Sequence, residues 1–268
     1  MDLWWVFLAI GAVVGFMAGL LGIGGGMILV PILLFMFTAQ GPAAGFPQEH
    51  LMHMALATSM ATIPFTSVSS VRAHHVRGGV DWTIVVGMLP GLAVGAMGAA
   101  LVAGLIPGRP LAIFFAAFIF YAATNMFFNL KPAGTRVLPG RLALGVVGAL
   151  VSFLAAFVAA GAAFMTIPFM VWCNVPLKRA VGTAAAIGFP LGLAASIGYV
   201  FAGLRAGPLP PWSLGFIYLP ALALIVIPSV FFAPLGARAS HRMPIKGLRI
   251  VFALTLYAIA IRMVVSLW

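Results

Sequence analysis

The residues that could bind a small solute in this chain are mostly uncharged, and glycines lead them. Residues 22–26 form a glycine run ahead of Pro31, and a related segment, residues 159–161, lies ahead of Pro168. Glycine lets the backbone leave a helix, and a helix that starts there points the positive end of its dipole at negative charge. The pattern therefore predicts an anion site, with close helix packing as the alternative. The glycines that we expect to line it are Gly22, Gly24, Gly25, Gly26 and Gly161.

Polar side chains after the glycine run are further candidates for substrate contact. Thr58 and Ser59 follow the first glycine run, and Thr183 follows the second segment. Hydroxyl groups donate to anionic oxygens without the cost of a buried charge, although they also bond back to the helix four residues earlier. His53 is either a substrate ligand or proton carrier, or a plain interfacial histidine. Asn125 either lines a pathway or links two helices.

Acidic and thiol groups are too few for most other chemistry. Asp2, Glu49 and Asp81 are the only acids, and Cys173 is the only cysteine. We expect all three acids at helix ends or in loops, with Asp81 as a loop residue or helix cap. The sequence therefore predicts no relay of buried carboxylates, no metal site, no cofactor and no enzyme active site.

Composition places the chain in a membrane. Of its 268 residues, 64% are hydrophobic and 6% are charged, and the mean hydropathy is +1.20. A soluble globule of this size needs more polar surface. The net charge of +11 does not indicate nucleic-acid binding, because the basic residues lie at the ends of apolar runs.

Gly87, Gly91 and Gly95, at four-residue spacing, predict close helix packing.

The chain contains an internal repeat with an offset of 137 residues. This offset relates Gly24 to Gly161 and Pro31 to Pro168. We therefore predict a first repeat over residues 1–130, a cytoplasmic linker over 131–141 and a second repeat over 142–268.

Two uncharged runs, residues 3–48 and 142–177, are too long for single spans. A straight helix over residues 3–37 would reach roughly 50 Å, whereas two half-length helices that meet at the glycines fit the hydrocarbon. The basic residues favour such hairpins. If each run folds back, eleven Lys and Arg residues share one face, and only Arg109, Arg205 and Arg262 share the other. The excess of positive charge predicts that both termini lie outside.

The predicted fold is an all-α integral membrane protein with two inverted repeats. Each repeat has a broken-helix hairpin and three transmembrane helices, and an odd number of crossings inverts the second repeat. The first repeat has its hairpin at 3–39 and helices at about 50–72, 82–107 and 109–130. The second has its hairpin at 142–173 and helices at about 178–203, 212–235 and 246–268.

Residues 19–31, 57–59 and 79–82 together resemble the sulfite exporter TauE/SafE family of membrane permeases, and the likeness covers nearly the whole chain. The resemblance implies transport of sulfite, sulfoacetate or related organic anions across the bacterial inner membrane, mostly outward. The chain departs from the family in residues 157–164, where members commonly repeat a glycine-rich motif. This departure predicts a difference in pocket shape and in substrate.

The function expected from sequence is a secondary transporter that moves small sulfur-containing anions by alternating access. The alternative is an anion-selective channel whose re-entrant segments are rich in glycine. The expected partners are a small anionic substrate and the lipid bilayer, without nucleic acid. The expected location is the bacterial inner membrane, which the chain crosses several times.

Overall fold

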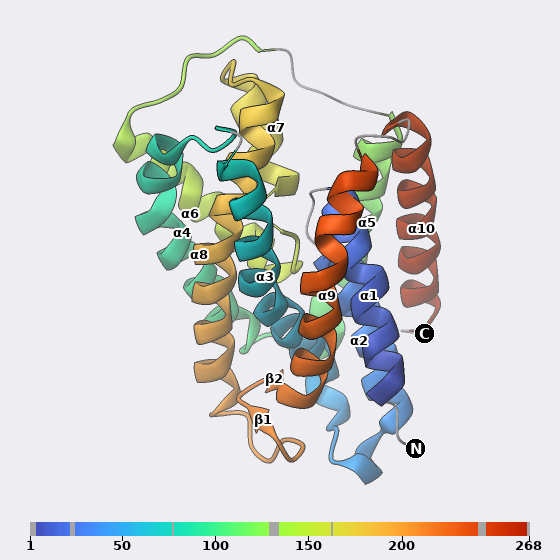
Figure 1. The fold of residues 1–268 in the computed structure, drawn as a ribbon. Helices are drawn as coiled ribbons and strands as arrows, with labels where there is room; N and C mark the ends of the chain where they lie inside the picture. The colour runs from blue at the N-terminus through green and yellow to red at the C-terminus, as the bar shows by residue number, and fades with distance from the viewer. Residues whose placement is uncertain are drawn as a thin grey trace.

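The computed structural model describes residues 4–21, 25–76, 78–128, 134–161, 163–240 and 245–266. This part of the chain folds into long helices and one short β-hairpin (Figure 1). The first half holds α1 (Trp4–Leu21), α2 (Gly26–Gln40), the 3₁₀ turns Pro42–Ala44 and Gln48–His50, α3 (Leu51–His75), α4 (Trp82–Ala103) and α5 (Gly108–Phe128). The second half holds α6 (Arg141–Phe157), α7 (Ala163–Trp172), α8 (Leu177–Gly203), β1 (Ser213–Leu214), β2 (Ile217–Tyr218), α9 (Leu219–Ser240) and α10 (Ile245–Ser266).

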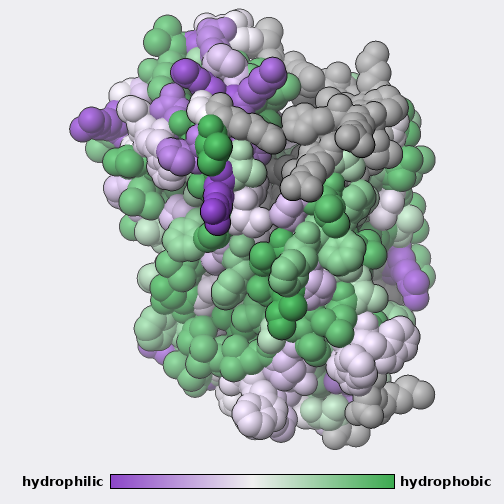
Figure 2. All heavy atoms as spheres, in the orientation of Figure 1, coloured by the Kyte–Doolittle hydropathy of each residue, from purple (hydrophilic) through white to green (hydrophobic). Residues whose placement is uncertain are grey.

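The chain is an all-α membrane protein. Among the described residues, five helical segments are long and apolar enough to cross a bilayer, and they include most of α3, α4, α5, α8 and α9. Apolar stretches of α1, α2, α6, α7 and α10 are shorter. On the face shown in Figure 2, hydrophobic side chains form a broad belt, and hydrophilic ones gather at the end where α3 finishes.

The bundle has two distinct ends, which we call the strand end and the linker end. The strand end carries β1, β2 and residues 41–50, and the linker end carries residues 134–140 (Figure 1). The chain enters α1 and leaves α2 at the strand end. At the linker end, the amides of Thr135 and Arg136 donate to the Trp172 carbonyl at the end of α7, each at 3.1 Å. Both short helix pairs therefore turn back inside the bundle.

Helices α3 and α8 pack against each other in the interior. The first fourteen residues of α3 are all buried. A Cβ placed on Gly192 of α8 would lie 2.8 Å from Cδ of Pro64 in α3, so glycine permits this close approach. Helix α3 also packs against α2 and α9, and α8 packs against α4 and α7.

Glycine stripes let the outer helices approach these partners. Gly91 and Gly95 of α4 face α6, where an added Cβ would collide with the carbonyl oxygens of Gly145 and Ala149. The packing predicted for the stripe that begins at Gly87 is confirmed. Helix α1 uses a second stripe against α9, which the sequence analysis missed although its spacing is the same. Its members are Gly11, Gly15 and Gly19.

We predict that Gly91→Ala lowers stability by about 1–3 kcal/mol, because the new methyl group has no space against α6. Gly98→Ala, on the same helix, is the matched control, since a Cβ there meets nothing within 4 Å. It should be neutral or stabilise by up to about 1 kcal/mol through helix propensity. Thermal unfolding in detergent micelles measures both, and equal melting temperatures for the two variants would contradict the packing.

Candidate functional site

The tips of the two short helix pairs meet inside the bundle. Gly26, the first residue of α2, lies so close to the chain after α6 that an added Cβ would collide with the carbonyl oxygen of Ala159. The same Cβ would lie 3.2 Å from the Ser59 hydroxyl of α3. The Ser59 hydroxyl donates a long, weak hydrogen bond of 3.5 Å to the Gly26 carbonyl. Three elements from both halves therefore converge on Gly26.

The start of α2 offers amide groups to this junction. Gly25 is the N-cap and has no side chain to cap the helix, and its carbonyl accepts from the amides of Ile28 and Leu29 at 3.2 and 3.0 Å. Helix geometry leaves the amides of Gly26 and Met27 without an acceptor inside the helix. Both residues are buried, so their N–H groups are suited to a negatively charged ligand.

The tip after α6 is strained at one residue. Ala159 has a φ of 42°, a left-handed conformation that costs a residue with a Cβ roughly 1–2 kcal/mol. It is fully buried, and the amide of Ala160 donates to the Ala155 carbonyl at 3.1 Å, which closes the end of α6. Gly161 is also buried and accepts from the Phe164 amide at 3.3 Å. The strained alanine fixes the carbonyl oxygen that faces Gly26.

Tyr199 supports this tip, although the sequence analysis missed it. Its fully buried hydroxyl, on α8, donates to the Ala156 carbonyl at 3.0 Å. A tyrosine inside an apolar helix needs a hydrogen-bond partner for its hydroxyl. Its place in such a helix is the only feature of the sequence that could have indicated this role. Ala159 belongs to the segment 159–161 that the sequence analysis named, but only Gly161 of that segment was predicted to line the site, although Ala159 lies 137 residues after Gly22.

Thr58 and Thr183 hold the two halves together at opposite ends of the bundle. Thr58 of α3 accepts a hydrogen bond of 3.0 Å from the amide of Tyr218, which precedes α9. Thr183 of α8 accepts one of 2.9 Å from the amide of Asp81, which precedes α4. Tyr218 lies 137 residues after Asp81, whereas Thr183 lies 125 residues after Thr58, so the two bonds join corresponding helices but only their donors match the 137-residue offset. The structure does not bring these two threonines into one site.

Asp81 is a helix cap, as one of the two predicted alternatives stated. Its carboxylate accepts from the amides of Thr83 and Ile84 at 3.1 and 3.4 Å at the start of α4. The other described acid, Glu49, is 78% exposed and lies 3.6 Å from Nε2 of His50. Neither described carboxylate lies at the junction of the helix tips.

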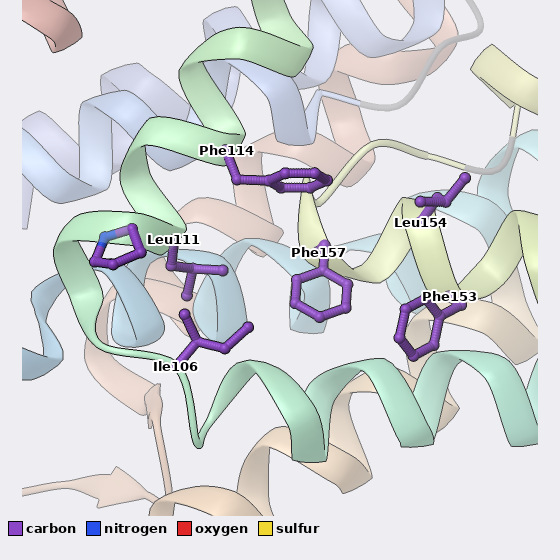
Figure 3. Close-up of a pocket in the computed structure, with 7 residues that line it drawn as sticks. Ile106, Leu111, Phe114, Phe153, Leu154 and Phe157 are labelled. Atoms are coloured by element: carbon purple, nitrogen blue, oxygen red, sulfur yellow. The ribbon is translucent and has the colours of Figure 1, made fainter.

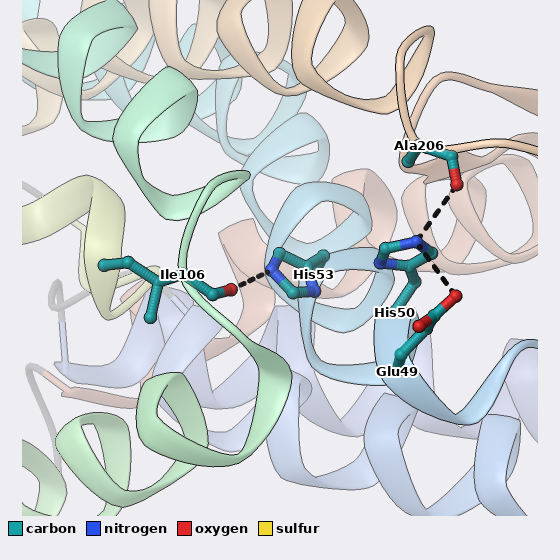
Figure 4. Close-up of polar contacts among 5 residues, drawn as sticks. All are labelled: Glu49, His50, His53, Ile106 and Ala206. Atoms are coloured by element: carbon teal, nitrogen blue, oxygen red, sulfur yellow. Dashed lines mark hydrogen bonds and ion pairs between the residues drawn. The ribbon is translucent and has the colours of Figure 1, made fainter.

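His53 links α3 to a neighbouring turn at the strand end (Figure 4). Its Nε2 lies 2.9 Å from the Ile106 carbonyl and 3.1 Å from the Ala103 carbonyl, so Nε2 carries the proton and donates. The ring is 2% exposed and stacks on Phe216, with centroids 5.0 Å apart. His53 precedes Ser59 by about 9 Å of helix rise.

Of the remaining predicted residues, Gly25 lies at the junction as the neighbour of Gly26, whereas the contacts of the described chain do not bring Asn125 there. Asn125 of α5 is half-buried, and its amide donates to the Tyr121 hydroxyl on the same helix at 3.5 Å. Gly22 and Gly24 lie outside the described residues. Gly25 is half-buried, and a Cβ on it would collide with the buried side chain of Val14.

An apolar cavity of about 370 Å³ lies between α5 and the end of α6 (Figure 3). Phe114 and Phe157, which line it, contact each other edge to face, with ring centroids 5.9 Å apart. Its other lining residues are Ile106, Pro110, Leu111, Phe153 and Leu154. The lining has no hydrogen-bonding side chain, so this cavity is not suited to a small anion.

Known proteins resemble the chain over almost its whole length. The family model described as "Sulfite exporter TauE/SafE" matches residues 7–263. A "Probable membrane transporter protein" of Haemophilus influenzae is 33% identical over 257 residues, which cover 96% of each chain. One from Methanocaldococcus jannaschii is 25% identical, covering 92% of this chain and 90% of its own. No solved structure gives a significant match.

The helical membrane fold and these relatives define a membrane transporter. The chain belongs to the sulfite exporter TauE/SafE family.

We predict that Thr58→Val and Thr183→Val each destabilise the protein by about 1–3 kcal/mol, because each leaves a backbone N–H without its acceptor. Thr255→Val is the control, since that exposed hydroxyl only bonds back to the Val251 carbonyl. Its effect should stay within about 0.5 kcal/mol. Thermal unfolding reports all three, and a Thr58→Val protein that melts like Thr255→Val would argue against the inter-half bond.

Proposed function

We propose that the chain is a secondary transporter that exports small sulfur-containing anions, such as sulfite, sulfoacetate or related sulfonates and carboxylates. The observation that carries the proposal is the meeting of Gly26 with the Ala159 carbonyl beside Ser59. Paired interrupted helices whose tips meet within the bundle are the arrangement in which many secondary transporters hold their substrates. The family description and the names of the relatives favour the same class.

The proposed anion site consists of backbone amides and hydroxyls. Gly25, Gly26 and Ser59 would contact the substrate from the first half, and Gly161 from the second. Gly22 and Gly24, which lie outside the described residues, belong to this proposal from the sequence alone. Such a site neutralises a small anion through helix dipoles and hydrogen bonds, without the cost of burying a lysine or an arginine. In this proposal Thr58, Thr183 and His53 hold helices in place and do not contact substrate, and Asn125 bonds within its own helix.

We propose that the two halves are inverted repeats that move against each other to give alternating access. The packing supports this proposal, because α1 pairs with α9 of the other half as α6 pairs with α4. The bonds from Thr58 to Tyr218 and from Thr183 to Asp81 likewise each join one half to the other. One bond lies toward each end of the bundle, so each is placed to open when its own end opens.

Membrane potential supplies the driving force in this proposal. Each unit of negative charge that leaves a negative interior gains about 2.3 kcal/mol per 100 mV. The proposed orientation places the strand end outside and the linker end in the cytoplasm, following the eleven-to-three division of basic residues. Export of an anion in this direction needs no coupled ion.

We predict that Gly26→Ala lowers substrate counterflow in proteoliposomes at least about tenfold, because the methyl group occupies the junction and displaces Ala159. Wild type should exchange labelled for unlabelled sulfite or sulfoacetate with saturation. Gly98→Ala, whose added carbon meets nothing, should exchange like wild type. Unchanged flux in Gly26→Ala would remove the junction from the site, and flux without trans-stimulation would indicate the channel alternative.

The orientation of the chain in the membrane is tested separately, by labelling cysteines introduced at exposed positions. Leu105 is 84% exposed at the strand end, and Val137 is 88% exposed in the linker. In a Cys173→Ala background, Leu105→Cys should react with an impermeant thiol reagent added to whole cells, whereas Val137→Cys should react only after lysis. Labelling of both from the same side would contradict the proposed topology, and the reverse pattern would invert it.

A further inference from the structure

A second cavity, of about 510 Å³, lies between α2, α5 and α10 at the strand end, apart from the junction of the helix tips. Its lining divides by polarity. Arg109, Arg262, Thr38 and Gln48 are its polar members. Pro31, Ile32 and Phe35 of α2 belong to an apolar wall that Ala112, Ile259 and Met263 continue.

Two arginines concentrate positive charge at this cavity. Arg109 is the second residue of α5, and Arg262 lies near the end of α10. They are two of the three basic residues that the hairpin arrangement assigns to this end of the protein, and the third, Arg205, is not in the lining. The lining contains no acidic side chain, and Glu49, next to Gln48, pairs with His50. The charge therefore suits an anion, which arginine binds through several donors at once.

The apolar wall suits a hydrocarbon chain. Leu29, Leu33 and Phe37 are completely buried on the core face of α2, whereas Ile32 and Phe35 line the cavity from another face. Phe35 is 54% exposed, and the Arg262 guanidinium lies 5.1 Å from its ring centroid. From Pro31 to Thr38 the wall follows α2 for about 10 Å. A small inorganic anion would leave this wall uncovered.

We propose that this cavity binds an anionic phospholipid of the surrounding bilayer. Arg109 and Arg262 would bind its phosphate, Gln48 would donate to headgroup oxygens, and one acyl chain would cover Ile32 and Phe35. The Thr38 hydroxyl already donates to the Leu34 carbonyl at 2.7 Å, so its oxygen is left to accept from a headgroup hydroxyl. The site is independent of the proposed transport of sulfur-containing anions. Its ligand combines one negative charge with an apolar chain, which is the combination that the lining presents.

The test is native mass spectrometry of the purified protein, titrated with phosphatidylglycerol or with phosphatidylcholine of identical acyl chains. Wild type should bind phosphatidylglycerol more tightly by about tenfold or more, since each arginine near the membrane surface contributes about fivefold. R109Q/R262Q should lose this preference. R205Q, which removes the third arginine of this end, should keep it, and R109K/R262K should keep most of it because the charge remains.

Excess glycerophosphoglycerol, the deacylated headgroup of phosphatidylglycerol, separates a lipid from a soluble anion. The lipid proposal predicts that it does not displace phosphatidylglycerol. Displacement would assign the cavity to a soluble anion and overturn the proposal. Equal binding of the two lipids by wild type, or an undiminished preference in R109Q/R262Q protein that remains monodisperse, would also overturn it. If R109Q/R262Q does not fold, R109Q and R262Q are tested singly, and a preference undiminished in both overturns the proposal.

Discussion

The structure depends on one constraint, which is that backbone groups exposed by a broken helix inside a bilayer must be covered by protein. Helix α2 begins at Gly26 and α6 ends at Phe157, both within the bundle. Their tips cover each other, and Gly26 permits the contact because it has no Cβ to meet the Ala159 carbonyl. The central helices α3 and α8 pack around this contact. The same uncovered amides that the fold must shield are those best suited to an anion.

The first helix of each half packs against a helix of the other half, and this pairing explains the arrangement of the outer helices. Helix α1 packs along α9 and α6 along α4, each through small residues that let the backbones approach closely. Thr58 and Thr183 then fix the starts of α9 and α4 to the central helices. Rigid-body motion of one half against the other would have to break one of these bonds, which gives the proposed alternating access a defined structural element at each end.

The class of the protein was predictable from sequence, and most contacts of its site were not. Composition predicted a membrane protein, the lengths of the uncharged runs predicted its helices, and the glycine run with the motifs at 57–59 and 79–82 indicated the family. Glycine spacing predicted the packing of α4, because helical periodicity is a local property. The partner of Thr58 lies 160 residues away, and that of Thr183 lies 102 residues away. No local pattern encodes such pairs, so a hydroxyl that holds two halves together looks the same in sequence as one that contacts substrate.

The most direct test of the proposed site is an experimental structure with a heavy analogue of the substrate, selenite in place of sulfite, located by its anomalous scattering. We predict a selenium peak within hydrogen-bonding reach of the Gly26 and Met27 amides and the Ser59 hydroxyl. Gly26→Ala should lose that peak while keeping its fold. A peak found only beside Arg109 and Arg262, or one at the junction that survives Gly26→Ala, would contradict a substrate site built from the backbone of the helix tips.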